Sequence, residues 1–137
     1  MDLCYNAITI EALRSPVREE AALEPIELAH QIIGLIEDKK GEDILLLDLR
    51  KITILADFFI ICSAQSDRQL KTLVETVSVE TKRQHRVRPR HIEGEAGDGW
   101  VLMDYGTVVV HIFTPERRRY YDLEGLWREA TVVVSIQ

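Results

Sequence analysis

The first half of the chain shows one helical and two strand-like hydrophobic patterns. Apolar residues recur at helical spacing between Pro25, which suits the first turn of a helix, and Gly41, which suits its end. We therefore predict a helix over this range. Asp43–Leu49 and Phe58–Cys62 are continuous apolar runs, which are typical of strands that are covered on both faces.

The second half predicts a helix, a hairpin and a final helix. Ser66 and Gln69 have the spacing of a capping box, and the helical pattern that follows extends to about Arg83. After a further short strand, apolar segments on either side of Gly106 predict a hairpin. Thr114-Pro115-Glu116 is typical of a helix start. This order of elements indicates an α/β fold with a mixed β-sheet and helices packed on it.

The predicted hairpin carries polar residues that a buried sheet would not need. Trp100 and Asp104 share one side because strand side chains alternate between faces. A two-residue loop at Gly106 places His111 on the same side. A charged residue within an apolar strand needs a partner or a surface. This side is therefore either a binding face or a partly exposed sheet edge with one salt bridge.

The composition describes one acidic domain. The chain has 137 residues, 46% of them hydrophobic, and a net charge of −6, so bulk charge does not indicate a nucleic-acid-binding protein. Its two cysteines, Cys4 and Cys62, form no Cys-x-x-Cys pair and indicate neither a zinc knuckle nor a redox motif. Because there is no disulfide framework, no apolar run of membrane length and no basic N-terminal region, we expect a cytoplasmic protein.

Two candidate ligand sites have little support. The Ser63–Ser66 turn joins a strand to a capped helix, as phosphate-binding turns do, but it lacks glycine and could be an ordinary junction. Glu93, Glu95 and Asp104 could hold magnesium for phosphoryl transfer, or the two glutamates could belong to a solvated loop. No histidine has metal-ligand spacing, and no motif combines a nucleophile with a base. The residues therefore indicate no metal site and no catalytic site.

Two segments are basic. Five cations and two histidines lie between Lys82 and His91. They could contact phosphates, or they could form a basic helix end that is balanced by the acidic loop after it. Arg117-Arg118-Arg119 is the second basic segment, and Tyr120 and Tyr121 beside it could anchor an interface.

Three ordered sequence blocks resemble a known family. They begin at Asp57, Gly99 and Arg119 and read DFFIICSAQSDRQ, GWVLMDYGTVVVHIF and RYYDLEGLW. These blocks are similar to the signature of the Iojap family of ribosomal silencing factors, RsfS. The resemblance covers roughly Glu24 to Glu129, so we take 24–130 as the domain. We expect a loosely ordered extension over 1–23 and a C-terminal tail over 131–137.

The resemblance implies a nucleotidyltransferase-like fold with no demonstrated transferase activity and no cofactor. Members of the family bind the large ribosomal subunit at ribosomal protein L-fourteen. They thereby block joining of the small subunit and repress translation when nutrients are scarce. We therefore expect a non-enzymatic translation repressor that binds the large subunit. A secondary contact with ribosomal RNA and a homodimer, which has been seen in the family, are further expectations.

Carried over position by position, the resemblance also implies a partner-binding face. Trp100 would be its anchor, and Asp104 and His111 would give polar specificity. The implied residues are Trp100, Val101, Asp104, Tyr105 and His111, flanked by Arg117, Arg118, Tyr120 and Tyr121.

Two alternative functions stay open. One is a magnesium-dependent nucleotidyltransferase-like enzyme, which the alanine at position 64, where many members have glycine, disfavours. The other is an RNA-binding module that uses residues 82–90.

Overall fold

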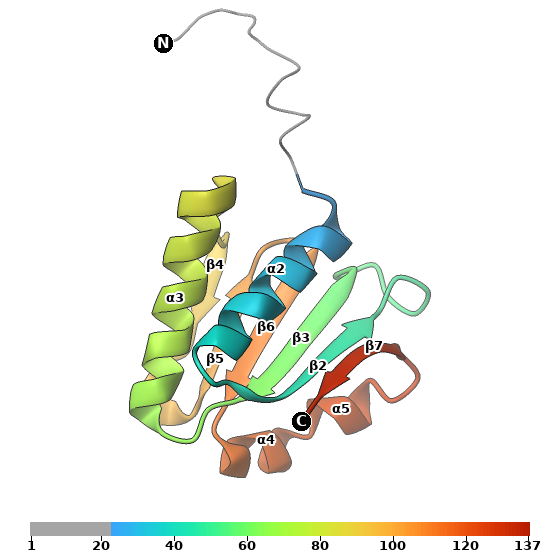
Figure 1. Cartoon of the computed structure of the whole chain (residues 1–137). Helices are drawn as coiled ribbons and strands as arrows, with labels where there is room; N and C mark the ends of the chain where they lie inside the picture. The colour runs from blue at the N-terminus through green and yellow to red at the C-terminus, as the bar shows by residue number, and fades with distance from the viewer. Residues whose placement is uncertain (1–22) are drawn as a thin grey trace, which may run out of the picture.

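A six-stranded mixed sheet runs through the centre of the protein, with helices on both of its faces (Figure 1). The computed structural model describes residues 23–137, so the extension expected over residues 1–23 lies outside the described residues except for its last residue. The strand order across the sheet is β4-β5-β6-β3-β2-β7. This arrangement confirms the mixed α/β fold that the hydrophobic pattern predicts.

The elements follow one another along the chain largely as predicted. The helices are α2 (Pro25–Asp38), α3 (Asp67–His85), α4 (Pro115–Tyr121) and α5 (Leu123–Leu126), with a single turn of 3-10 helix, η2, at Ala96–Asp98. The strands are β2 (Glu42–Asp48), β3 (Phe58–Ser63), β4 (His91–Glu93), β5 (Trp100–Asp104), β6 (Val108–Phe113) and β7 (Thr131–Ile136). None of the helices in residues 23–137 is long and apolar enough to span a membrane.

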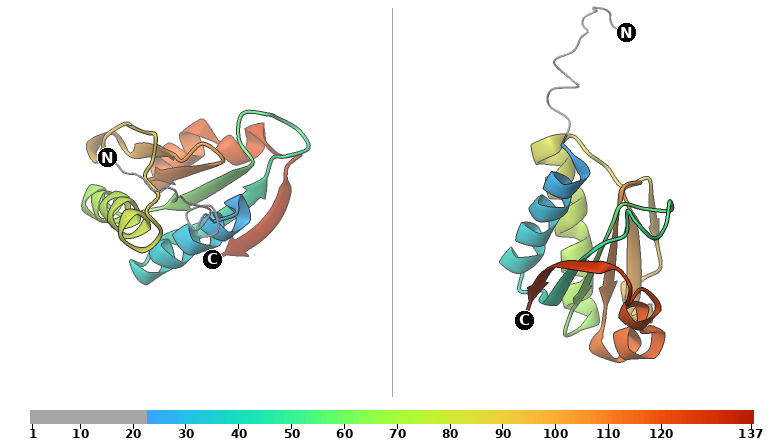
Figure 2. Two further views of the ribbon diagram at one scale, coloured as in Figure 1. Left: turned by 90° about the horizontal axis from the view of Figure 1, so that it is seen from above. Right: turned by 90° about the vertical axis from the view of Figure 1, so that its right-hand side faces the viewer.

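The middle of the sheet is its one parallel pair, β3 and β6, and all other neighbouring strands are antiparallel. The chain leaves β3 for α3 on one face of the sheet and leaves β6 for α4 on the opposite face (Figure 2). The two faces therefore receive different helices, and we call the face under α2 and α3 the first face and the other the second face.

The hairpin formed by β5 and β6 has the predicted register. Trp100 pairs with Phe113, and the amide of Tyr105 donates to the carbonyl of Val108 at 2.8 Å, which closes a two-residue loop. Gly106 in this loop has φ +91°, a conformation that glycine adopts without strain. The prediction that Trp100, Asp104 and His111 lie on one side of the hairpin is confirmed.

The first face is sealed by two long helices. Ser66 caps α3 by accepting a hydrogen bond from the amide of Gln69 at 3.1 Å, as the capping-box pattern predicts. The Gln69 side chain bonds elsewhere, accepting from the amide of Gln65 at 2.7 Å, so only half of the predicted box is present. Fully buried core residues from both layers include Ile32, Ile36, Leu46, Ile60, Leu70, Leu73, Met103 and Ile112.

The second face is covered only in part, by α4, α5 and the turn that follows them. A smaller core lies beneath them and includes Ile61, Phe113 and Trp127. These helices have 7 and 4 residues, whereas α2 and α3 have 14 and 19. The second face is therefore the part of the sheet where side chains can reach the surface.

The expected C-terminal tail is not a tail. Residues 131–136 form β7, which pairs antiparallel with β2 as the edge of the sheet. Val134 packs against the first-face core, and Val132 and Val133 remain exposed at the edge. The prediction was wrong because a short C-terminal strand obtains its hydrogen bonds from a partner far away in the sequence.

Candidate protein-binding interface

Aromatic rings gather on the second face around Trp100. The Trp100 indole stacks on Phe113 at 5.0 Å between ring centroids and lies 4.5 Å from the ring of Tyr121 on α4. His111 lies 4.6 Å from Phe59, whose ring meets Trp127 edge-on at 5.7 Å. We call this set the aromatic cluster: Phe59, Trp100, His111, Phe113, Tyr121 and Trp127.

His111 lies inside the aromatic cluster rather than at its surface. It is 3% exposed, and its Nδ1 accepts a hydrogen bond from the Trp100 indole N–H at 3.3 Å. Its Nε2 is buried without a hydrogen-bond partner among the described residues. Because burial disfavours the charged imidazolium, the pKa of His111 is lowered to about 4. A neutral His111 therefore orients the indole, and it does not reach a partner directly in this conformation.

Val101 and Tyr105 do not lie on the face that the resemblance implied for them. Both are in the first-face core, on the opposite side of β5 from Trp100. The Tyr105 hydroxyl lies 2.9 Å from the hydroxyl of Thr81 on α3, and burial raises the pKa of Tyr105. Strand alternation is the physical reason, since residues one position apart on a strand point to opposite faces.

Asp104 lies on the expected side but away from Trp100. The two residues are four positions apart on β5, which corresponds to about 13 Å along the strand. The Asp104 carboxylate accepts a hydrogen bond from the amide of Gly106 at 2.7 Å and so stabilises the hairpin loop. The structure brings Trp100 and His111 into contact, while Asp104 marks the far end of the same face.

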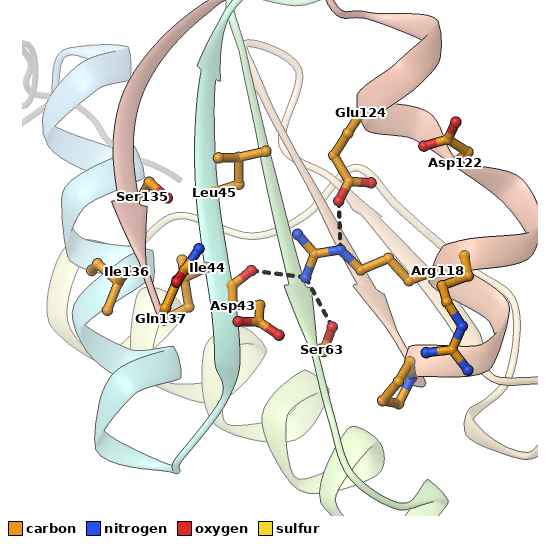
Figure 3. Close-up of a pocket in the computed structure, with 12 residues that line it drawn as sticks. Asp43, Ile44, Leu45, Ser63, Arg118, Asp122, Glu124, Ser135, Ile136 and Gln137 are labelled. Atoms are coloured by element: carbon orange, nitrogen blue, oxygen red, sulfur yellow. Dashed lines mark hydrogen bonds and ion pairs between the residues drawn. The ribbon is translucent and has the colours of Figure 1, made fainter.

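Arg118 is the least exposed arginine of the second basic segment, and its side chain is 12% exposed. Its Nε donates to Glu124 at 2.8 Å, and its Nη1 donates to the carbonyl of Asp43 at 2.7 Å and to the hydroxyl of Ser63 at 2.8 Å (Figure 3). These bonds tie α4 and α5 to the ends of β2 and β3. Arg118 is therefore a positioning residue, and the expectation that it flanks the binding face directly is corrected.

A cavity of about 510 Å³ lies beside Arg118, between α4, α5 and the end of β7. Figure 3 shows Asp43, Asp122, Glu124 and Arg118 around it, so its wall carries both acidic and basic side chains. Ser63 also lines the cavity, but its hydroxyl already accepts a bond from Arg118. This mixed wall does not favour an anion such as a nucleotide phosphate.

The remaining residues of the second basic segment are accessible. Tyr120 is 73% exposed and Tyr121 is 43% exposed. Arg117 is exposed, and its guanidinium lies 5.9 Å from the ring centre of Tyr120. Together with the partly exposed Trp100, these side chains form an aromatic and cationic surface at the α4 end of the second face.

Sequence reasoning missed further exposed apolar side chains on this side of the sheet. Leu126 on α5 is 72% exposed. Ile54 and Leu55, in the connection between β2 and β3, are 101% and 77% exposed. The ends of this connection, Leu49 and Ala56, pack in the second-face core. No periodic pattern distinguishes such residues from core residues, although an apolar pair within a loop is a signal that could have been weighed.

The two ligand sites considered from the sequence are not assembled. Glu93, Glu95 and Asp104 form no group that could hold a metal ion within residues 23–137. At the Ser63–Ser66 turn, Ala64 is fully buried and its amide donates to the carbonyl of Phe113 at 2.7 Å. That amide is therefore not available to a phosphate.

Comparison with known proteins identifies the family. The family described as "Ribosomal silencing factor during starvation", RsfS, matches residues 22–137. The chain belongs to the RsfS family. The match includes the residues of β7, in keeping with their place in the sheet.

Individual RsfS relatives are similar over most of the chain. The ribosomal silencing factor of Chromobacterium violaceum is 41% identical over 105 residues, covering 77% of this chain and 85% of the relative. That of Halalkalibacterium halodurans is 35% identical over 107 residues, covering 78% and 91%. A crystal structure of a Chromobacterium violaceum protein has a TM-score of 0.73 and 38% identity, covering 82% of this chain and 94% of that one.

Proposed function

We propose that this RsfS-family protein represses translation by binding the large ribosomal subunit at ribosomal protein L-fourteen. The bound protein would then sterically prevent the small subunit from joining. The family description and the names of the relatives support the silencing role. The contact with L-fourteen and the steric block are our proposal for how the protein performs that silencing role.

The observation that carries the proposal is the uneven distribution of exposed apolar side chains. Among the described residues, the first-face side holds two exposed large apolar side chains, Val79 on α3 and Ile92 on β4, which pairs with Met103 of the first-face core. The second-face side holds six: Ile52, Ile54, Leu55, Tyr120, Tyr121 and Leu126. Exposed apolar surface of this kind is typical of protein-binding sites, and tyrosines are enriched among the residues that dominate binding energy. A protein partner such as L-fourteen suits this surface.

We infer that the protein acts without catalysis. The residues considered for a magnesium-dependent enzyme form no metal-binding group within residues 23–137, and at the Ser63–Ser66 turn the amides of Ala64 and Gln65 already donate within the protein. A ligand that binds only the folded state raises its stability by mass action. We therefore expect no shift of the thermal midpoint on adding ATP with magnesium, and a saturable shift would favour the enzymatic alternative.

A subunit-joining measurement tests the function. Purified large subunits are incubated with the full chain, small subunits are added, and joined ribosomes are followed by light scattering. We expect the joined fraction to fall as the protein saturates the large subunit. Unchanged joining at saturation would overturn the steric block.

Binding of the wild-type protein to isolated L-fourteen is measured in parallel. The absence of binding would overturn the assignment of L-fourteen as the partner. The homodimer expected from the family stays a prediction.

A further inference from the structure

The basic segment Lys82–His91 forms an exposed edge that the proposed protein interface does not use. It comprises the last turn of α3, the connection to β4 and the first residue of β4. Arg86, Arg88 and Arg90 are exposed, and they alternate with the partly buried Val87 and Pro89. Because Val87 packs against the first-face core, the segment is held in place while its arginines stay exposed.

The arginines of this segment are not balanced by the acidic loop that follows. Within residues 23–137, the segment makes one ion pair, between Arg83 and Glu80 one helical turn earlier. Arg86, Arg88 and Arg90 take part in no ion pair with a described residue. The pairing of β4 with β5 places Glu93 beside Leu102, and Glu93 makes no ion pair with a described residue. These observations disfavour the alternative considered from the sequence, in which the acidic loop after the segment balances its positive charge.

The basic segment also adjoins the far end of the second face. The amide of Arg90 donates to the carbonyl of Asp104 at 2.6 Å, so the segment is fixed to the end of β5. The Arg90 guanidinium lies against the hairpin loop, where its Nη1 is 3.1 Å from the position that a Cβ on Gly106 would occupy. A partner bound on the second face would therefore have its flank close to these arginines.

We propose that the basic segment contacts the phosphate backbone of ribosomal RNA beside the docked ribosomal protein. Accessible arginines without acidic partners, on a chain of net charge −6, are a local feature that suits a polyanion. Arginine also presents several donors to phosphate oxygens, so the three exposed arginines can bind a backbone without reading its sequence. This inference rests on the proposed function, since the RNA is reached only when the protein is docked.

The test compares the salt dependence of two binding reactions. Affinity for purified large subunits and for isolated L-fourteen is measured between 50 and 200 mM monovalent salt. The variant is the triple substitution Arg86→Gln, Arg88→Gln and Arg90→Gln. A matched control removes three exposed cations elsewhere, with Lys40→Gln, Arg68→Gln and Lys71→Gln.

We expect the variant to bind large subunits more weakly and with a salt slope smaller by about three. Between 50 and 200 mM salt, the factor by which affinity falls should therefore be roughly 40 times smaller for the variant than for the wild type. Binding to isolated L-fourteen should be unchanged, and the control should keep the wild-type slope. An unchanged slope, an equal effect of the control, or an equal loss of L-fourteen binding would overturn the RNA contact. If the wild type fails to bind L-fourteen at all, it is the proposed function that fails.

Discussion

The two faces of the sheet differ in how completely they are covered. On the first face, α2 and α3 bury side chains such as Ile60 and Met103 fully. On the second face, two short helices leave Trp100 partly exposed and Tyr120 and Leu126 largely exposed. The contrast teaches that the first face is the main stabilising core, and it supports the proposal that the second face binds the partner. Substitutions on the two faces should therefore separate unfolding from loss of partner.

The largest effect on stability is expected on the first face. Ile60→Ala removes a fully buried side chain and leaves a cavity under α2 and α3, which should lower the free energy of unfolding by about 2–5 kcal/mol. Urea denaturation followed by circular dichroism measures it. A loss as small as that of an exposed residue would show that the first face is not the stabilising core.

Acid should weaken the second-face core through His111. The pKa of this side chain is about 4 in the folded state and 6.5 as its ordinary value, so the unfolded chain binds the extra proton. Stability should therefore fall as the pH drops from about 6.5 toward 4, by roughly 3 kcal/mol at most from this group. Denaturation of the wild type and of His111→Leu across this range measures the difference. Equal pH dependence in both proteins would contradict the burial of a neutral imidazole.

Arg118 should contribute more to the free energy of unfolding than an exposed arginine that is also paired with a carboxylate. Arg118→Gln removes the bonds to Glu124, Ser63 and Asp43, and we expect a loss of about 1–3 kcal/mol. Hydrogen exchange should become faster in α4 and α5. The control Arg50→Gln breaks a pair with Asp48 at the surface and should leave stability nearly unchanged. Similar effects of both substitutions would argue against a positioning role for Arg118.

The smallest effect on stability is expected at Tyr120. Since this side chain is 73% exposed, Tyr120→Ala should change the free energy of unfolding by no more than about 0.5 kcal/mol. A thermal melt measures it. A large loss would place Tyr120 in the fold rather than in the interface, and would remove it as a reporter of binding.

Local patterns predicted the fold well, and non-local contacts account for what they missed. Alternation and loop length correctly placed Trp100 and His111 on one side of the hairpin, because both depend on neighbouring residues alone. The same alternation already separated Val101 and Tyr105 from Trp100, and only the family resemblance had grouped them. β7 was missed because its partner β2 is far away in the sequence, although its β-branched run Thr131–Val134 was a signal for a strand.

The candidate site was harder to predict because burial of charged residues depends on the tertiary fold. Three consecutive arginines precede Tyr120, and nothing local distinguishes Arg118 from the other two. Its partners Asp43 and Ser63 lie 75 and 55 residues earlier in the chain. The depth of His111 is likewise set by Phe59, on a different strand. Sequence identified the aromatic and cationic region, and the structure divided it into accessible residues such as Tyr120 and residues such as His111 and Arg118 that are bonded within the fold.

The central claim is that the exposed second face binds the large subunit. Co-sedimentation with purified large subunits tests it directly, with Trp100→Ala and Tyr120→Ala as variants and Val79→Ala on α3 as the matched control. We expect the wild type and Val79→Ala to sediment alike and both second-face variants to bind at least about fivefold more weakly. Wild-type binding by both second-face variants would contradict the assignment of this face. Failure of the wild type to sediment would contradict the function itself.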